Sequence, residues 1–175
     1  MSGTSAEPTR WQDEMYDELR KANVTQFCYV PDAGHIIMIN RSLADPEVHS
    51  IGLTSEEEGV ALLAGADLGG ARGVLLMQSS GVGNCINMLS LIEGSRFPFL
   101  CIVSMRGQFG EGNPWQYAMG QAVETVLSAM GVICLKVDRP EDVVGTVQAA
   151  LTMTFKSGRS VAVLLGQKLL GAKKF

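Results

Sequence analysis

The sequence predicts an α/β fold in which six parallel strands form one doubly wound sheet between two layers of helices, a three-layer α/β/α arrangement. Two observations predict it. Short apolar runs typical of buried strands alternate with helical patterns along nearly the whole chain. The run FPFLCIVSM at 97–105 is apolar without interruption, as expected when helices cover both faces of a parallel sheet. No linker or internal repeat divides the chain, so we expect one domain over residues 1–175.

The elements follow one another in a regular order. Residues 1–6 are expected to be a disordered tip, and Trp11, Met15 and Leu19 recur at helical spacing in a first helix at 7–22. Further helical patterns occupy 36–45, a segment opening at Thr54 or Ser55, 87–93, 116–130 and 140–155. The runs expected to form strands are 27–31, 49–53, 73–78, 97–105, 132–137 and 160–165.

Composition excludes several classes of function. The net charge of −4 and the absence of a basic stripe argue against nucleic-acid binding. No apolar run is long enough to span a membrane, and the first residues lack a signal-peptide pattern, so we expect a cytoplasmic protein. The four cysteines show no C-x-x-C spacing and are expected to be reduced core residues. Charged residues make up only 18%, which suggests that a partner covers part of the surface.

Polar and glycine-rich segments follow four of the predicted strands, at 31–35, 53–57, 78–84 and 106–115. Ligands of doubly wound sheets bind at the carboxyl ends of the strands, so these segments are expected to share one functional edge. The longest of them opens at Arg106, at the end of the most apolar strand. No group of residues in these segments suggests a metal site of the chain's own.

Three consecutive acids, Glu56, Glu57 and Glu58, open the third predicted helix. Thr54 or Ser55 can cap this helix, with an acid three residues later returning the hydrogen bond. Acids at a helix N-terminus also complement the helix dipole, and we interpret Glu56 and Glu58 in this way. Glu57 is interpreted differently because of the motif in which it lies.

That motif is E-x-G from Glu57 followed by VALLAGA, and a second motif, S-G-x-G-x-x-N from Ser80 to Asn87, follows the strand GVLLMQ. Together they resemble the pyrimidine-binding (Pyr) domain of thiamine-diphosphate enzymes, over nearly the whole chain. The resemblance implies that Glu57 is a catalytic residue that contacts the aminopyrimidine ring of the cofactor. It also implies that the loop residues Ser80, Gly81 and Asn84 lie at the cofactor.

Within that family the chain is most similar to the short alpha subunits of enzymes that decarboxylate sulfopyruvate, in coenzyme M or sulfonate metabolism, and next to phosphonopyruvate decarboxylases. Family members bind the diphosphate and Mg²⁺ through a G-D-G sequence in another domain, and this chain has none. The resemblance therefore implies a hetero-oligomer in which a separate beta subunit supplies the diphosphate and Mg²⁺ site. The substrate would be a small anionic 2-oxo acid.

Three further residues are candidates for contacts with that substrate. Arg106 could grip its anionic group with a guanidinium fork, or could be a surface arginine at a strand end. His35 could relay a proton as a second catalytic residue, or could be a polar helix cap. Asp32 could position the substrate or a water. Two other functions stay open: a nucleotide or flavin binder that uses the S-G-V-G loop as an anion site, and a regulatory subunit without catalysis.

Overall fold

The computed structural model describes residues 10–171, so the predicted disordered tip at 1–6 lies outside the described residues. Strands and helices alternate along the chain. The strands are β1 (Val24–Tyr29), β2 (His49–Gly52), β3 (Arg72–Gln78), β4 (Phe99–Ser104), β5 (Ile133–Val137) and β6 (Ser160–Leu165). The helices are α1 (Trp11–Lys21), α2 (Ile36–Ala44), α3 (Glu56–Leu68), α4 (Ser79–Cys85), α5 (Leu89–Ser95), α6 (Trp115–Ala129), α7 (Val143–Phe155) and α8 (Gln167–Leu170), with short 3-10 turns η1 (Ala33–His35) and η2 (Pro140–Asp142).

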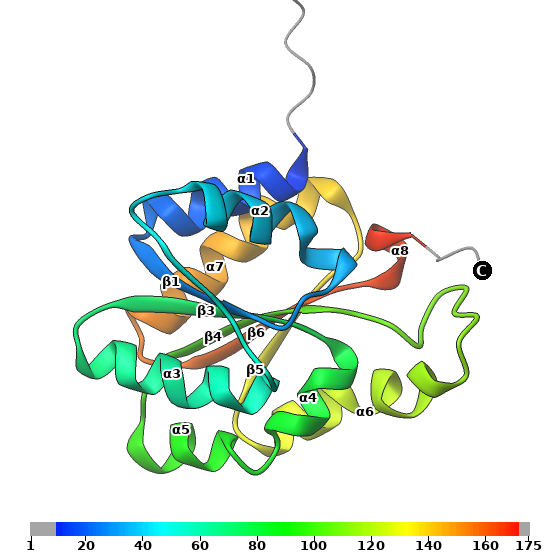
Figure 1. Cartoon of the computed structure of the whole chain (residues 1–175). Helices are drawn as coiled ribbons and strands as arrows, with labels where there is room; N and C mark the ends of the chain where they lie inside the picture. The colour runs from blue at the N-terminus through cyan, green and yellow to red at the C-terminus, as the bar shows by residue number, and fades with distance from the viewer. Residues whose placement is uncertain (1–9, 172–175) are drawn as a thin grey trace, which may run out of the picture.

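The six strands form one parallel sheet in the order β2-β1-β3-β4-β6-β5, which confirms the predicted fold class. Figure 1 shows α1, α2 and α7 on one face of the sheet and α3, α4, α5 and α6 on the other. After β1 the chain moves to one edge through β2, whereas after β3 it moves to the other edge through β4. The neighbouring carboxyl ends of β1 and β3 are therefore the switch point at which such sheets bind ligands.

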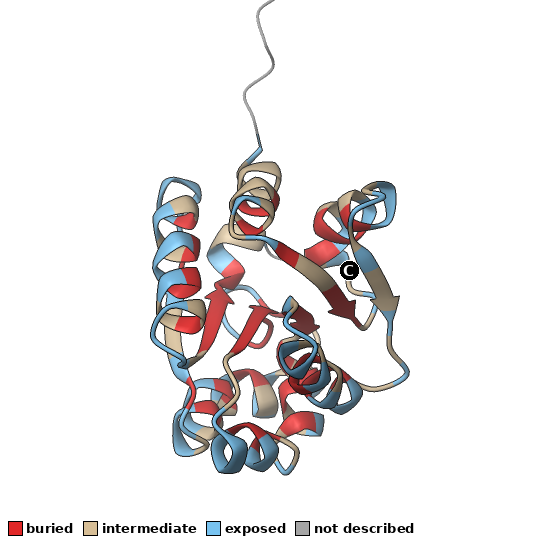
Figure 2. Cartoon of the chain, turned by 90° about the vertical axis from the view of Figure 1, so that its left-hand side faces the viewer, coloured by how far each residue is buried: buried red, intermediate tan, exposed pale blue. Residues whose placement is uncertain are grey.

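Two apolar clusters hold the three layers together. One joins α1, α2 and α7 to the sheet through side chains such as Met15, Leu19 and Val147, and the other joins the opposite helices through Val60, Leu63 and Leu127. Every residue of β4 is buried, as the uninterrupted apolar run predicted. Figure 2 shows the buried strands between helices whose outer faces are exposed. None of the described helices is both long and apolar enough to cross a bilayer.

The structure corrects one local prediction, the loop from Ser80 to Asn87. Helix α4 begins at Ser79, directly after β3, so the S-G-V-G sequence is helical. Gly81 and Gly83 do not have the positive φ that a tight glycine turn requires. Their lack of a side chain serves close packing instead, because a Cβ on Gly81 would lie 2.3 Å from Oε1 of Glu56. Glycine supplies space here, not backbone freedom.

Candidate active site

A hydrogen-bonded chain of polar side chains occupies the switch point. Ser80 Oγ donates to Gln78 Oε1 at 2.9 Å, and Gln78 Nε2 donates to Asp32 Oδ1 at 3.0 Å. The second oxygen of Asp32 accepts from Ser104 Oγ at 2.6 Å and from the backbone N–H of Gly34 at 2.9 Å. These hydrogen bonds connect the carboxyl ends of β1, β3 and β4.

Asp32 is the acceptor at the centre of this network. Burial is the largest single effect and would raise its pKa, but the lowering effects, led by the hydrogen bonds from Ser104 and Gln78, together outweigh it, so the pKa lies below the usual value for aspartate. Asp32 is therefore a carboxylate at neutral pH. The sequence predicted Asp32 at this edge, but the partners Gln78 and Ser104 were not predicted as site residues.

The acidic start of α3 presents its three glutamates to different surroundings. Glu56 is buried, and its Oε2 accepts a hydrogen bond from Asn84 Nδ2 at 2.8 Å. Glu57 is exposed to solvent. Glu58 is also exposed, and its Oε2 accepts from the backbone N–H of Thr54 at 3.0 Å; the N-cap residue Ser55 makes no side-chain capping hydrogen bond, so the predicted capping box is not formed. Glu56 is thus the buried acid of the three, whereas Glu57, the acid of the E-x-G motif, faces solvent.

Helix geometry explains why Glu56 is buried. Residues three, four, seven and eight positions after Glu56, among them Gly59, Val60 and Leu63, form the buried face of α3. Glu56 begins that stripe, and Glu57 lies one position, about 100° of helix rotation, away from it. The carboxyl group of Glu56 is thereby held against Gly81 of α4.

His35 lies below the site and not in its wall. Its side chain is 1% exposed, and Nε2 lies 3.1 Å from the backbone oxygen of Met77, to which it donates. Among the described residues Nδ1 has no hydrogen-bond partner. Burial lowers the pKa of His35, so the ring is neutral. The imidazole does not line the pocket described below, and the role of His35 as a catalytic proton relay stays a prediction.

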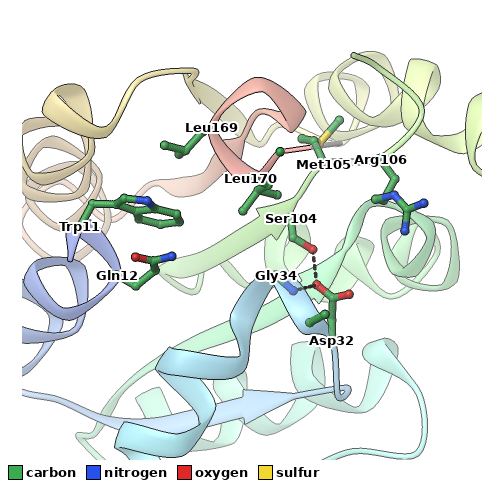
Figure 3. A pocket seen from close by; sticks show the side chains of 11 residues that line it. Trp11, Gln12, Asp32, Gly34, Ser104, Met105, Arg106, Leu169 and Leu170 are labelled. Atoms are coloured by element: carbon green, nitrogen blue, oxygen red, sulfur yellow. Dashed lines mark hydrogen bonds between the residues drawn. The ribbon is translucent and has the colours of Figure 1, made fainter. Parts of the chain in front are cut away.

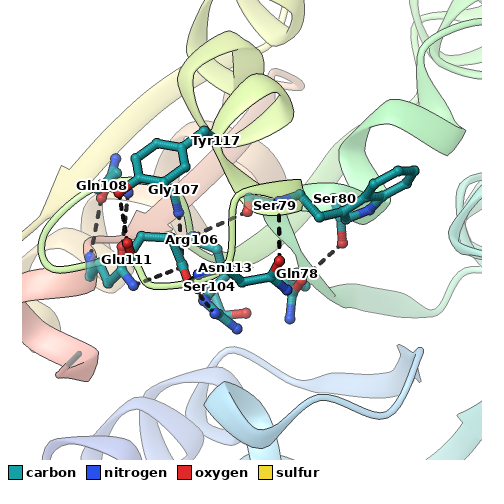
Figure 4. A network of polar contacts seen from close by, with 12 residues as sticks. Gln78, Ser79, Ser80, Ser104, Arg106, Gly107, Gln108, Glu111, Asn113 and Tyr117 are labelled. Carbon is teal, nitrogen blue, oxygen red and sulfur yellow. Dashed lines mark hydrogen bonds and ion pairs between the residues drawn. The ribbon is translucent and has the colours of Figure 1, made fainter. Parts of the chain in front are cut away.

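Arg106 lies at the end of β4 as predicted, but its guanidinium is occupied. Nε donates to Glu111 Oε2 and Nη2 to Glu111 Oε1, both at 2.6 Å (Figure 4). Glu111 also accepts from the backbone N–H groups of Gly107 and Asn113 and from Gln167 Nε2. Four of these five hydrogen bonds lie within the 106–115 loop, and the one from Gln167 connects the loop to α8. The pKa of Glu111 lies well below its usual range, and the hydrogen bonds from Arg106 are the largest cause.

This lowered pKa makes the stability of the chain depend on pH. A carboxyl group with a depressed folded-state pKa stabilises the fold above its unfolded pKa of about 4.3, and the contribution is lost as the pH falls toward the folded value. Glu111→Gln should therefore lower the free energy of unfolding by about 3–5 kcal/mol at neutral pH, because Arg106 stays buried without its partner. The loss should shrink at pH 3, as measured by urea unfolding. Glu58→Gln, which removes an exposed carboxyl group, is the control, and an equal loss for Glu111→Gln at both pH values would contradict the assignment.

A pocket of about 200 Å³ opens between α1, η1, the end of β4 and α8 (Figure 3). Its polar side carries Asp32, Ser104 and Arg106, and its apolar side is formed by residues such as Trp11 and Leu170. The residues that line it are Trp11, Gln12, Asp32, Ala33, Gly34, Ser104, Met105, Arg106, Leu169, Leu170 and Gly171.

The predicted site residues therefore fall into two groups. Asp32 and Arg106 line the pocket. Gly81 and Asn84 lie with Glu56 on the α3 side, and Ser80 connects to Asp32 through Gln78. His35 and the exposed Glu57 belong to neither group.

Comparison with known proteins supports a common family. No family model matches the chain. A sulfopyruvate decarboxylase subunit alpha of Methanocaldococcus jannaschii is 33% identical over 86% of this chain and 89% of its own length, and that of Methanococcus maripaludis is 31% identical over 87% and 92%. The chain belongs to the sulfopyruvate decarboxylase alpha-subunit family.

A further relative and one solved structure match the chain over a part of their own length. A phosphonopyruvate decarboxylase of Streptomyces viridochromogenes is 38% identical over 59% of this chain and 27% of its own length. Among solved structures, 2-oxoglutarate:ferredoxin oxidoreductase from Magnetococcus marinus superposes with a TM-score of 0.75 at 18% identity, over 93% of this chain and 29% of that one. The latter likeness shows a shared fold.

Proposed function

We propose that this chain is the alpha subunit of a cytoplasmic thiamine-diphosphate-dependent carboxy-lyase that converts sulfopyruvate to sulfoacetaldehyde and CO₂. Its relatives in the family carry the name of that activity at 30–33% identity. The structural observation that carries the proposal is the buried carboxyl group of Glu56. It lies against Gly81 of α4, among the strand ends where doubly wound sheets bind ligands.

The site fits the aminopyrimidine end of the cofactor. Glu56 Oε2 accepts a hydrogen bond from Asn84, and Oε1, which lies against Gly81, accepts no hydrogen bond from the described residues. We therefore propose Glu56, in place of Glu57, as the catalytic carboxyl group. Ser80 and Asn84 on α4 would contact the ring, and Gly81 leaves room beside Glu56. Thiamine diphosphate supplies, when bound, a nucleophilic carbon and a sink for the electron pair released with CO₂.

The other residues at this edge of the sheet can hold the reacting groups in place and shield them from water. Asp32 is fixed by Ser104 and Gln78, so it can orient a substrate group or a water without moving. The apolar side chains of Trp11 and Leu170 exclude water from the same pocket.

The geometry argues against the alternative of a nucleotide or flavin binder. An anion at the start of α4 would meet the acidic side chain of Glu56, which packs against Gly81. Helix N-termini that bind phosphate offer free N–H groups to the anion and no acid. A phosphonopyruvate decarboxylase subunit stays a second candidate because of the 38% identity over the shared segment. Assays of the assembled enzyme with sulfopyruvate and phosphonopyruvate will decide between the two substrates.

The absence of a G-D-G sequence supports a partner that provides the diphosphate and Mg²⁺ site. We expect the isolated chain neither to bind thiamine diphosphate tightly nor to decarboxylate a 2-oxo acid. Calorimetric titration with cofactor and Mg²⁺ tests the binding, and a coupled assay with and without a co-expressed G-D-G polypeptide tests the activity. Robust turnover by the isolated chain would contradict the proposed division into two subunits.

A further inference from the structure

One positive and two negative groups lie at or directly behind the polar side of the pocket beside Asp32. Arg106 is the sole cationic side chain among the described residues that line it. Two carboxylates lie near this single positive charge. Asp32 is in the pocket wall, and Glu111 is in direct contact with the guanidinium. Counted together, one positive and two negative charges leave this corner with a net charge of −1. Such a corner does not attract an anionic substrate.

Glu111 also prevents an external anion from binding the guanidinium of Arg106. Glu111 occupies Nε and Nη2 of Arg106 and leaves only Nη1 free of that pair. The carboxylate is held in place by three more donors, from Gly107, Asn113 and Gln167. A group tethered in the same chain competes at a high effective concentration, so an external anion displaces it poorly. A sulfonate is in addition a weaker hydrogen-bond acceptor than a carboxylate.

We propose that Glu111 is a specificity-determining residue that closes Arg106 to anions, so that the positive charge which recognises an anionic substrate comes from outside the described wall of this pocket. Arg106 then serves as a positioning residue for the 106–115 loop and offers one N–H to the pocket. This replaces the sulfonate-gripping role that the sequence suggested. Only the identity of the anion rests on the proposed function.

The first test needs no activity. The ¹⁵N side-chain signals of the arginines are followed in the full chain while methanesulfonate is added as the probe. We expect the Arg106 Nε signal of the wild type to show no saturable shift at millimolar methanesulfonate, and that of Glu111→Gln to shift saturably. Glu58→Gln makes the same change of charge at an exposed position and should behave like the wild type. A saturable shift of Arg106 in the wild type overturns the proposal, whether or not the variant folds.

The second test uses the assembled enzyme. Arg106→Lys keeps the charge but loses the two-point contact with Glu111, so kcat/KM should fall by the same factor for sulfopyruvate and for pyruvate. A loss confined to sulfopyruvate would show that Arg106 holds the sulfonate and would overturn the proposal. A wild-type enzyme that decarboxylates neither substrate would instead refute the proposed function, and the arginine signals would still decide the role of Glu111.

Discussion

Glu56→Gln is expected to abolish most of the decarboxylase activity of the assembled enzyme and to leave the fold intact. Glutamine has nearly the same shape and can keep the contact with Asn84, but it cannot share a proton with a ring nitrogen. The loss of a proton-transfer group lowers the rate by roughly 10²–10⁴-fold. The measurement is kcat at saturating cofactor, with circular dichroism and thermal unfolding as checks on the fold.

Glu57→Gln and Glu58→Gln are the matched controls, because they remove neighbouring carboxyl groups from the same helix turn. Both side chains are exposed, so each change should affect only the electrostatics of the helix end, by about 0.3–1 kcal/mol. Activity should stay close to that of the wild type in both. If Glu57→Gln is as inactive as Glu56→Gln, the assignment that the motif suggested is restored and the one from burial is wrong.

The difference between Glu56 and Glu57 shows what a motif can and cannot predict. The E-x-G pattern matches Glu57 alone, because only Glu57 lies two positions before Gly59, but the pattern does not indicate which of the three acids is buried. The spacing of apolar residues could have resolved it, because Glu56 lies three and four positions before Gly59 and Val60 on the buried stripe. The helical period is thus a better guide than the short pattern to which acid faces the interior.

The fold class was predictable because it depends on local alternation. Most strands contain a short apolar run, and the complete burial of β4 follows from its uninterrupted apolar sequence. Helix α4 was not predicted, because glycine in a sequence can signal either a backbone turn or a close contact. Only the tertiary position of Glu56 beside Gly81 distinguishes the two.

The polar partners in the site could not be predicted for a related reason. Glu111 looked like one acid in a glycine-rich loop, and its contact Gln167 is 56 residues away in sequence. His35 looked like a titratable group at a functional edge, but the backbone oxygen of Met77, 42 residues later, holds it below the surface. Hydrogen bonds of this range depend on the packing of the whole sheet.

Gly81→Ala should move the carboxyl group of Glu56 without lowering the stability of the chain. A Cβ at this position would lie 2.3–2.6 Å from the carboxyl end of Glu56. Because the obstructing atoms belong to a flexible side chain, the protein can relieve the clash by turning Glu56 aside. Alanine also favours the helical backbone of α4 by up to about 1 kcal/mol over glycine. We therefore expect an unchanged or slightly raised Tm.

Activity should respond to Gly81→Ala in the opposite way. A displacement of a reacting group by about 1 Å can lower the rate by on the order of 10²-fold, so kcat of the assembled enzyme should fall by roughly that factor. Gly83→Ala is the control in the same helix, since its Cβ would meet only Met119, with Sδ at 3.1 Å. That variant should gain the same helix propensity and keep its activity. Equal activities of the two alanine variants would show that the position of the Glu56 carboxyl group is not critical, and the proposed role of Glu56 would then fail with it.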